Sequence, residues 1–268
     1  MTATQTLRVR ELAALEEQHD AAALLARVWG ASVLRPQIDP GLIRAFAHTG
    51  NYVAGAYAGA ELAGVAVGFL AGDGHLHSHM TGVLPAYRGL DAAFLLKQHQ
   101  RSWALERRIG EIRWTCDPLV GRNAYFNLHK LGAAVVSYLP DFYGPMEDGI
   151  NRGSPSDRLA VSWRLGSPRA VAAAAGDPAP VPDALLQRAT VAVARVREEP
   201  VALDMPGSGA PALLIAVPRD VEALRIADPE LAARWRPVVR EAMQAALAAG
   251  YTVTGISRDG HYVLEDRS

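Results

Sequence analysis

The sequence holds a single cysteine, Cys116, among 268 residues, and this scarcity excludes an intrachain disulfide. Cys116 lies in an apolar segment, which favours a role as a small core residue over a role as a nucleophile. No cysteine or histidine pattern has zinc-type spacing, so no metal is expected. Long apolar runs are also missing: none reaches the roughly 18 residues that span a bilayer, and no signal-peptide core is present. We therefore expect a cytoplasmic protein with no membrane partner.

Charge of one sign is not in excess. The 27 basic and 28 acidic residues are interspersed and give a formal net charge of −1. A chain without basic tracts has no general attraction for nucleic acid, so no nucleic-acid partner is expected. Half of the residues are hydrophobic, which supplies a core for one large domain or two small ones.

The stretch Val83–Ala93, V-L-P-A-Y-R-G-L-D-A-A, carries the clearest functional signal. The apolar strand expected over His75–Leu84 ends at Pro85, which cannot donate to a sheet ladder, and an amphipathic helix over Asp91–Arg107 follows the turn. Backbone amides at the start of such a helix are unpaired and lie at the positive end of the helix dipole, so they bind anions. Arg88 adds a guanidinium that matches two phosphate oxygens. This stretch therefore predicts a phosphate-binding turn.

The order of elements in this turn resembles the V-x-P-x-x-R-G-x-G-x-G signature of the GNAT superfamily of N-acetyltransferases, which binds the pyrophosphate of an acyl-CoA. Four residues match the signature, namely Val83, Pro85, Arg88 and Gly89. Ala93 stands at the last small-residue position, whereas Asp91 replaces a glycine. Asp91 either caps the helix with its side chain or repels the pyrophosphate and weakens CoA binding; the cap is the favoured interpretation.

The resemblance implies that acetyl-CoA or another acyl-CoA is a co-substrate. The residues that it assigns to this ligand are the strand end, the turn and the first helical turn: Val83, Leu84, Tyr87, Arg88, Gly89, Leu90, Asp91, Ala92 and Ala93.

A second block strengthens the resemblance. I-R-W-T-C-D-P-L at Ile112–Leu119 indicates a buried strand, and R-N-A-Y-F-N-L-H-K-L-G-A at Arg122–Ala133 indicates a helix that ends at Gly132. In the GNAT superfamily a helix ending in K-L-G lies beside the pantetheine arm. Together with Y-L-P-D-F-Y-G at Tyr138–Gly144, these motifs look most like one subgroup of acyltransferases with a C-terminal extension.

Periodicity and turn residues predict an α+β fold with a mixed sheet, and the resemblance adds that the central strands part to admit pantetheine. The elements expected ahead of the phosphate-binding turn are a strand at Leu7–Arg10, helices at Leu12–Val28 and Gly41–His48, and a hairpin of Tyr52–Tyr57 with Leu62–Leu70. A strand through Val135 and Tyr138 follows the second block.

Composition divides the chain into a GNAT-like acyl-CoA-binding domain at residues 1–165, an Ala/Pro-rich linker at 166–183 and a smaller α+β subdomain at 184–268. The elements expected in the subdomain are strands at Val201–Met205 and Ala212–Val217, one or two helices at Asp220–Ala249, and a hairpin of Thr252–Ser257 with His261–Leu264. It serves either as a lid or dimer surface, which makes a second copy of the chain a partner, or as a wall of the acceptor pocket.

Acyl transfer to an amine needs a base, because removing a proton from an amine of pKa about 10 at neutral pH costs roughly 4 kcal/mol. His75, His77 and His79 alternate along the strand that leads to the turn, so all three are expected on one face. His79 is the leading candidate base, since it lies closest to the expected thioester; a packed, hydrogen-bonded histidine explains it equally well. A metal held by the three is disfavoured because no carboxylate or cysteine accompanies them.

The resemblance also places a thiol-protonating tyrosine where this chain has Leu128. The phenols that remain are Tyr125, Tyr138 and Tyr143, and Tyr125 and Tyr143 are kept as catalytic candidates, although packing explains each. In the same fold the backbone N–H near Leu84 is expected to stabilise the oxyanion.

Three polar residues lie where the second strand and helix of the motif region meet. Arg122 is expected to bind a carboxylate on the acceptor or on a succinyl-type acyl group, and Asn123 is expected to contact pantetheine. Asp117 is a second candidate for binding the substrate. Helix capping is an equal interpretation for Asp117 and Asn123.

The sequence as a whole predicts an N-acyltransferase that moves acetyl, succinyl or another short acyl group from CoA to the amine of a small molecule, such as an amino acid, by direct attack in a ternary complex. A non-catalytic acyl-CoA sensor or assembly protein is the alternative, because the tyrosine is lost and Asp91 replaces a glycine. O-acylation of a hydroxyl group differs only in the acceptor.

Overall fold

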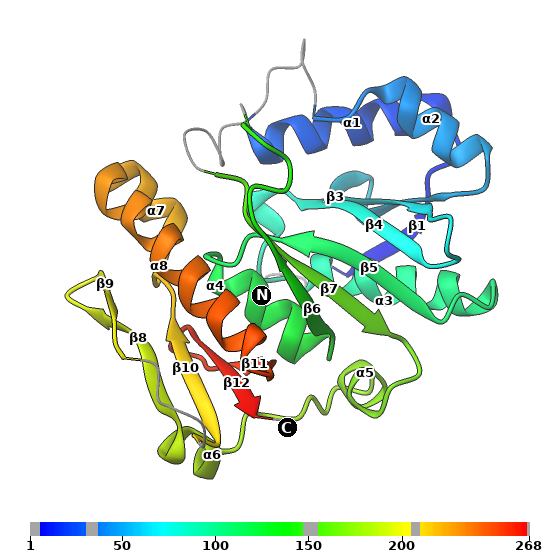
Figure 1. Cartoon of the computed structure of the whole chain (residues 1–268). Helices are drawn as coiled ribbons and strands as arrows, with labels where there is room; N and C mark the ends of the chain where they lie inside the picture. The colour runs from blue at the N-terminus through cyan, green and yellow to red at the C-terminus, as the bar shows by residue number, and fades with distance from the viewer. Residues whose placement is uncertain (1–5, 31–36, 147–154, 205–209, 267–268) are drawn as a thin grey trace, which may run out of the picture. The chain divides into compact units, whose positions relative to one another are not determined.

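The computed structural model of the chain describes residues 6–30, 37–146, 155–204 and 210–266 (Figure 1). These residues group into two compact units, of which the first takes in the described residues up to Trp114 and the second those from Thr115 onward. Within the described ranges no helix is both long and apolar enough to cross a bilayer.

The first unit is an open sheet with helices on both faces. Its elements are β1 (Leu7–Glu11), α1 (Leu15–Trp29), α2 (Pro40–His48), β2 (Tyr52–Ala58), β3 (Glu61–Leu70), β4 (Leu76–Val83), a 3₁₀ turn η1 (Pro85–Tyr87), α3 (Ala92–Glu106) and β5 (Glu111–Cys116). The strands lie in the order β1-β2-β3-β4-β5. The first four pair antiparallel, and β5 runs parallel to β4. Gly59, with φ of 62°, allows the tight β2–β3 hairpin.

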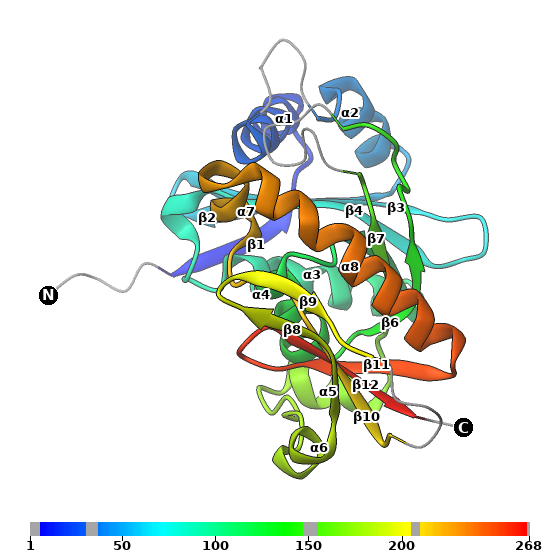
Figure 2. The same ribbon diagram turned by 60° about the vertical axis from the view of Figure 1, so that its left-hand side comes forward.

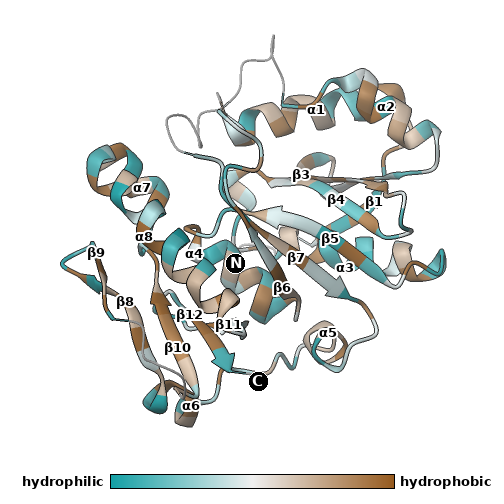
Figure 3. Cartoon of the chain, in the orientation of Figure 1, coloured by the Kyte–Doolittle hydropathy of each residue, from teal (hydrophilic) through white to brown (hydrophobic). Residues whose placement is uncertain are grey.

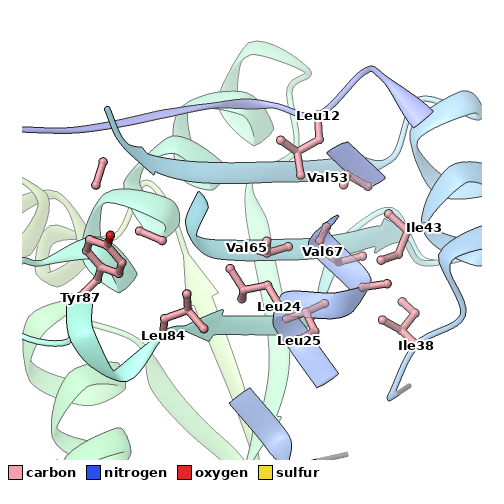
Figure 4. Packing of buried hydrophobic residues seen from close by; sticks show 14 residues of the cluster. Leu12, Leu24, Leu25, Ile38, Ile43, Val53, Val65, Val67, Leu84 and Tyr87 are labelled. Atoms are coloured by element: carbon pink, nitrogen blue, oxygen red, sulfur yellow. The ribbon is translucent and has the colours of Figure 1, made fainter. Parts of the chain in front are cut away.

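The main hydrophobic cluster of the first unit lies between the sheet and the helices α1 and α2, while α3 covers the opposite face (Figures 1 and 2). Leu24 and Leu25 of α1 meet Val65 and Val67 of β3 in this cluster (Figure 4). On the other face, Tyr52 packs edge-on against Trp103 of α3, with ring centroids 5.4 Å apart. Burial on both faces explains why β2 and β3 are apolar almost throughout.

Strand β4 leaves β5 after a short contact. The two pair in parallel only at Leu76 with Ile112 and at His77 with Arg113, although β4 continues to Val83. A β-bulge also interrupts β4 opposite β3, because Val67 pairs with Met80 and Gly68 with Ser78, which leaves His79 without a ladder partner. The central strands thus part, as the sequence predicts, and the edge of β4 beyond His77 is not paired with β5.

The second unit contains a second sheet. Its elements are α4 (Gly121–Tyr125), a π-helical turn η2 (Phe126–Lys130), β6 (Ala134–Leu139), β7 (Arg158–Arg164), α5 (Pro168–Ala174), α6 (Asp183–Arg188), β8 (Thr190–Val196), β9 (Glu199–Ala202), β10 (Ala212–Ala216), α7 (Val221–Ala227), α8 (Pro229–Ala248), β11 (Tyr251–Ile256) and β12 (His261–Asp266). Strands β6 and β7 pair antiparallel. The five-stranded sheet has the order β11-β12-β10-β8-β9, with β10 and β8 parallel, and the apolar strand β10 lies at its centre (Figure 3).

Two buried carboxylates hold α8 in the second unit. Oδ2 of Asp117 accepts hydrogen bonds from Arg236 of α8 and Arg225 of α7, both at 2.9 Å. Asp157 accepts from Nε of Arg240 at 2.8 Å, one helical turn further along α8. Burial opposes the charge on Asp117, but the two arginines prevail and lower the pKa of this carboxyl. Guanidinium–carboxylate pairs therefore join α8 to Asp117 and Asp157, and they join α7 to Asp117.

Replacing Asp117 with Asn should destabilise the chain by about 3–5 kcal/mol, because two buried guanidinium groups lose their counter-ion. Urea unfolding measures this loss, with the exposed Asp20→Asn as a matched control that should change stability by less than about 0.5 kcal/mol. The pKa of Asp117 is lowered in the native state. The excess unfolding free energy of the wild type over Asp117→Asn should therefore be full at neutral pH and disappear as pH falls through that pKa. Equal stabilities of the two variants at pH 7 would contradict this role for Asp117.

The expected fold class is confirmed, including a mixed sheet in the first part and a second sheet toward the C-terminus. Strands β7 and β8 are absent from the sequence-based expectation, and Asp220–Ala249 forms two helices. Met205, the end of one expected strand, lies outside the described residues. The domain boundaries at 165 and 184 remain a prediction; the compact units divide at Trp114, so β6 and β7 fall in the same unit as the second sheet.

Candidate active site

The turn predicted to bind phosphate contains two residues with left-handed backbone dihedrals. Gly89 has φ of 96° and Asp91 has φ of 53°, so both adopt left-handed conformations. A Cβ added at Gly89 would meet no atom within 4 Å, so the space in front of this residue is open. In the part of the chain that the structure describes, the amides of Ala92, Ala93 and Phe94 have no hydrogen-bond partner. Three backbone donors thus remain for an anion at the start of α3.

Arg88 precedes this cradle and is exposed. Among the described residues its guanidinium forms no hydrogen bond or ion pair, so it is free to bind a ligand. Its own amide donates to the carbonyl of Pro85 at 3.2 Å, and that of Leu90 donates to Tyr87 at 3.3 Å. These bonds close the turn and leave the binding of an anion to the Arg88 side chain and the helix amides.

The expected side-chain cap by Asp91 is wrong. Asp91 occupies the N-cap position, but its side chain makes no capping hydrogen bond. A capping residue has extended backbone dihedrals, whereas Asp91 is left-handed. Aspartate is among the few residues that tolerate this conformation. Asp91 therefore places a carboxylate beside the cradle.

Three residues assigned to the ligand have structural roles instead. The amide of Leu84 donates to the carbonyl of Ala63 at 3.0 Å, so the oxyanion role expected for it is contradicted. The Tyr87 ring is buried in the hydrophobic cluster, at one end of the group drawn in Figure 4. Val83 packs against the same cluster. These side chains position the turn rather than line it.

The three histidines at the start of β4 stack along one face, as expected: His75 directly precedes the strand, and His77 and His79 lie in it. Ring centroids are 6.5 Å apart for His75 and His77 and 6.0 Å apart for His77 and His79. Nδ1 of His75 is hydrogen-bonded to a carboxylate oxygen of Asp73. Burial, together with the neighbouring histidines, lowers the pKa of His77 to about 4. No group of three potential metal ligands occurs among the described residues.

His79 differs from the other two. Its residue is exposed, it sits at the bulge, and it has no hydrogen-bond partner in the described ranges. Surrounding protein atoms lower the pKa of its ring by desolvation. His79 is therefore neutral at pH 7 and able to accept a proton, which is what its candidate role as base requires.

Lys97 of α3 is a polar residue that the sequence-based search missed. Its side chain is 4% exposed. Its Nζ donates to Oγ of Ser78 at 2.7 Å and to Oε1 of Gln100 at 3.2 Å, and it lies 4.1 Å from the ring centroid of Trp114. Burial lowers the pKa of this amine to about 7. Ser78 and Trp114 directly follow the last paired residues of β4 and β5, so Lys97 lies where the strands part.

The candidate tyrosines belong to the second unit. Tyr125 stacks on His129 with centroids 4.6 Å apart. The Tyr143 hydroxyl lies 3.0 Å from Oγ1 of Thr115, and the residue is exposed. Tyr138 donates to Asp157 at 2.6 Å and belongs to the buried network at α8. Tyr125 and Tyr143 thus keep reachable hydroxyls, and their catalytic role remains a prediction.

A cavity of about 480 Å³ opens in the second unit, within the usual size of small-molecule sites. Its lining comes from α4, the loop after β10 and the β11–β12 hairpin: Gly121, Arg122, Tyr125, Pro218, Arg219, Ser257, Arg258, Asp259 and Gly260. Arg219 is paired with Glu198 at 3.3 Å. The Arg258 guanidinium has no partner in the described part of the chain. Arg258 is therefore the lining cation best placed to meet an acidic group on a small ligand.

The residues expected to bind the acceptor are partly contradicted. Asp117 is buried and held by two arginines, so it is not available to a substrate. Arg122 lines the cavity but is ion-paired with Glu222 of α7 and lies 4.0 Å from Asp220. A guanidinium with two acidic neighbours is a weaker carboxylate receptor than a free one. Asn123 is half-buried on α4, and its contact with pantetheine remains a prediction.

Cys116 packs as the core residue that the sequence predicts. It is 5% exposed, and burial raises the pKa of its thiol to about 12. A thiol with such a pKa is not ionised at neutral pH and is a poor nucleophile.

Comparison with solved structures identifies the fold. A protein from Acinetobacter baylyi ADP1 described as an acetyltransferase is 16% identical, with a TM-score of 0.51 over 63% of this chain and 97% of that chain. An acetyltransferase from Salmonella typhimurium, solved with acetyl-CoA as its cofactor, is 13% identical, with a TM-score of 0.49 over 60% and 95%. The ribosomal-protein-S18-alanine N-acetyltransferase from Escherichia coli is 12% identical, with a TM-score of 0.47 over 60% and 96%.

The amino-acid sequence matches no family model, and it matches no curated protein either. The structure nevertheless has the GNAT acetyltransferase fold over about 60% of the chain, and the remaining C-terminal part is an unmatched extension. The resemblance stated from the sequence motifs is thereby confirmed at the level of the fold.

Replacing Lys97 with Met tests its buried amine. Between pH 7 and the ordinary lysine value of about 10, the unfolded chain binds a proton that the native chain has released, so native stability rises with pH there. The variant has no amine to titrate, so its stability lacks this rise. We therefore expect the unfolding free energy of the variant minus that of the wild type to fall by about 2–3 kcal/mol from pH 6 to pH 9. Urea unfolding at both pH values measures it, and parallel pH dependences for the two proteins would refute the assignment.

Proposed function

We propose that the protein is an acyl-CoA-dependent N-acyltransferase that moves a short acyl group to the amine of a small molecule. The observation that carries this proposal is the turn at Arg88–Phe94, where an unpaired guanidinium and three unpaired amides meet directly after β4. These donors suit a diphosphate. The GNAT fold supports the same conclusion, since a neighbour of this fold is described with acetyl-CoA bound.

The parting of β4 and β5 supports a place for the rest of the co-substrate. Beyond His77, the edge of β4 that faces away from β3 has no pairing with β5. A free strand edge binds extended, amide-containing chains through main-chain hydrogen bonds, and pantetheine contains two amides. A diphosphate at the turn would lead such a chain back along β4, with the thioester toward the bulge at His79.

In the proposed reaction, the neutral amine nitrogen attacks the thioester carbonyl carbon. A C–N bond forms, the C–S bond breaks, and the CoA thiolate takes up the proton that the attacking nitrogen releases as it becomes an amide. His79 accepts the proton that the ammonium form of the acceptor must lose. The backbone at the bulge replaces Leu84 as the candidate donor to the oxyanion, because a bulged residue lacks a ladder partner.

One observation favours a binding protein without catalysis. Leu128, which stands where the family carries its thiol-protonating tyrosine, is 1% exposed, so no acid occupies that position. Thiolate is already a good leaving group, and a missing acid slows the reaction without preventing it. Release of free thiol from acyl-CoA, above the hydrolysis control, when a panel of small amines is added supports transfer. Tight binding with no such release would support the sensor.

Arg88→Ala should weaken CoA binding about 10- to 100-fold, because the loss of a charge-assisted hydrogen bond to phosphate costs about 1.5–3 kcal/mol. Isothermal titration calorimetry measures the Kd, and the rise in Tm with CoA gives a second readout. Arg8→Ala, an exposed arginine of β1, is the matched control and should bind CoA as the wild type does. If the two variants bind equally, the turn at Arg88 is not the diphosphate site.

His79→Gln should lower kcat by about 100-fold, the smaller end of the usual effect of removing a general base. The wild-type kcat/KM should fall as pH drops through the pKa of His79, which lies below the ordinary histidine value, because the protonated ring cannot accept a proton. The variant should lose this acidic limb. A variant with wild-type kcat and the same pH profile would exclude His79 as the base.

A further inference from the structure

We propose that Lys97 binds a carboxylate at the far end of the acyl chain, so that the preferred co-substrate is the CoA thioester of a short dicarboxylic acid. The inference rests on the proposed function, because it names the acyl group of the same site. Three points support it: the position of Lys97 between β4 and β5, the expected direction of the acyl chain, and the lack of a carboxylate partner for Lys97 among the described residues.

Lys97 lies where β4 and β5 begin to separate, which is the closed end of the gap between the two strands. Its Nζ donates to Ser78 of β4 at 2.7 Å and lies 4.1 Å from the ring centroid of Trp114 of β5. Each of these residues comes directly after the last pair between the two strands, His77 with Arg113. The amine thus contacts the first residue of each strand beyond the last β4–β5 pair.

The expected direction of the co-substrate brings its acyl end to this amine. The cradle for the diphosphate follows Val83, at the open end of the divergence. From Leu84 back to Ser78 the strand advances six residues, or roughly 20 Å at about 3.3 Å per residue, a distance that an extended pantetheine arm spans. The acyl group, which lies beyond the sulfur, therefore points toward Lys97.

Lys97 lacks a negatively charged partner. Its polar contacts are the hydroxyl of Ser78 and the amide oxygen of Gln100, both neutral, and among the described residues no carboxylate pairs with it. The Gln100 side chain is also fully buried, and its Nε2 has no hydrogen-bond partner in the described part of the chain. A buried ammonium without a counter-ion is costly, and so is a buried unpaired N–H. One ligand carboxylate with two oxygens would satisfy both.

The choice of lysine at this position agrees with a binding role. The chain has 25 arginines and only two lysines, Lys97 and Lys130. Arginine keeps its charge at any accessible pH, so burying it without a partner would be prohibitive, whereas a lysine can release its proton until the anion arrives. A carboxylate ligand should therefore bring a proton with it when it binds at pH above 7.

Among the described residues, His77 of β4 is the titratable group that interacts electrostatically with Lys97, and its pKa of about 4 keeps it neutral above pH 5. Trp114 of β5 and Gln100 of α3 do not titrate. Of these described groups, Lys97 is therefore the one that sets the pH dependence of carboxylate binding at this place between pH 6 and 9.

Calorimetric titration of the full chain with CoA, acetyl-CoA, butyryl-CoA and succinyl-CoA tests the proposal. Free CoA reports on the diphosphate site alone, so each acyl-CoA is judged by the ratio of the Kd of CoA to its own Kd. We expect this ratio to be at least about tenfold larger for succinyl-CoA than for butyryl-CoA at pH 6.5, because charge-assisted bonds to a buried ammonium exceed apolar contacts of the same length. The preference should shrink at pH 8.5.

Lys97→Met should abolish both the preference and its pH dependence, with circular dichroism confirming that the variant is folded. Gln100→Leu, which keeps the amine and removes the second donor, should reduce the preference only in part. If wild type and Lys97→Met give the same ratio for each of the three acyl-CoAs while CoA binds, the carboxylate inference fails and the proposed function stands. If CoA itself does not bind the wild type, both fail.

Discussion

The short parallel contact between β4 and β5 is the constraint on which the rest of the site depends. Two residue pairs join the strands at Leu76 and His77, after which β4 continues alone to the phosphate-binding turn. Had the pairing continued, the edge of β4 would be saturated and the turn would end an ordinary sheet. Because it stops, one strand offers an unpaired edge, a bulge and an anion cradle in sequence, and α3 places a buried amine where the strands part.

Most of the first unit could be predicted from the sequence because its signals are local. Gly30 ends α1 and Asp39 caps the start of α2. Gly59 makes a tight turn between the apolar strands β2 and β3. Each of these signals determines structure over a few residues. The turn near Arg88 was predictable for the same reason. The prediction that the Asp91 side chain caps α3 was wrong, but Asp91 does occupy the N-cap position. Its backbone is left-handed, whereas a side-chain cap requires an extended backbone.

The parts that could not be predicted depend on distant partners. Asp117 meets Arg225 and Arg236, more than a hundred residues away, and no local pattern distinguishes such a carboxylate from a substrate ligand. The β8–β9 hairpin turns at Arg197 and Glu198, both with positive φ, without the Asn-Gly pair that marks such turns. For Lys97 a signal did exist: Ala92, Leu96, Gln100 and Trp103 define the buried stripe of α3, and Lys97 lies on it. A charged residue on a buried stripe needs a partner, and that question leads to the site.

A crystal structure of the chain grown with CoA tests the central claim most directly, because it locates the diphosphate without reference to any acceptor or acyl group. The structure described here predicts that diphosphate oxygens accept hydrogen bonds from the amides of Ala92, Ala93 and Phe94 and from the Arg88 guanidinium, with pantetheine along the unpaired edge of β4. A diphosphate bound elsewhere, or a turn filled by the protein's own side chains, would contradict it.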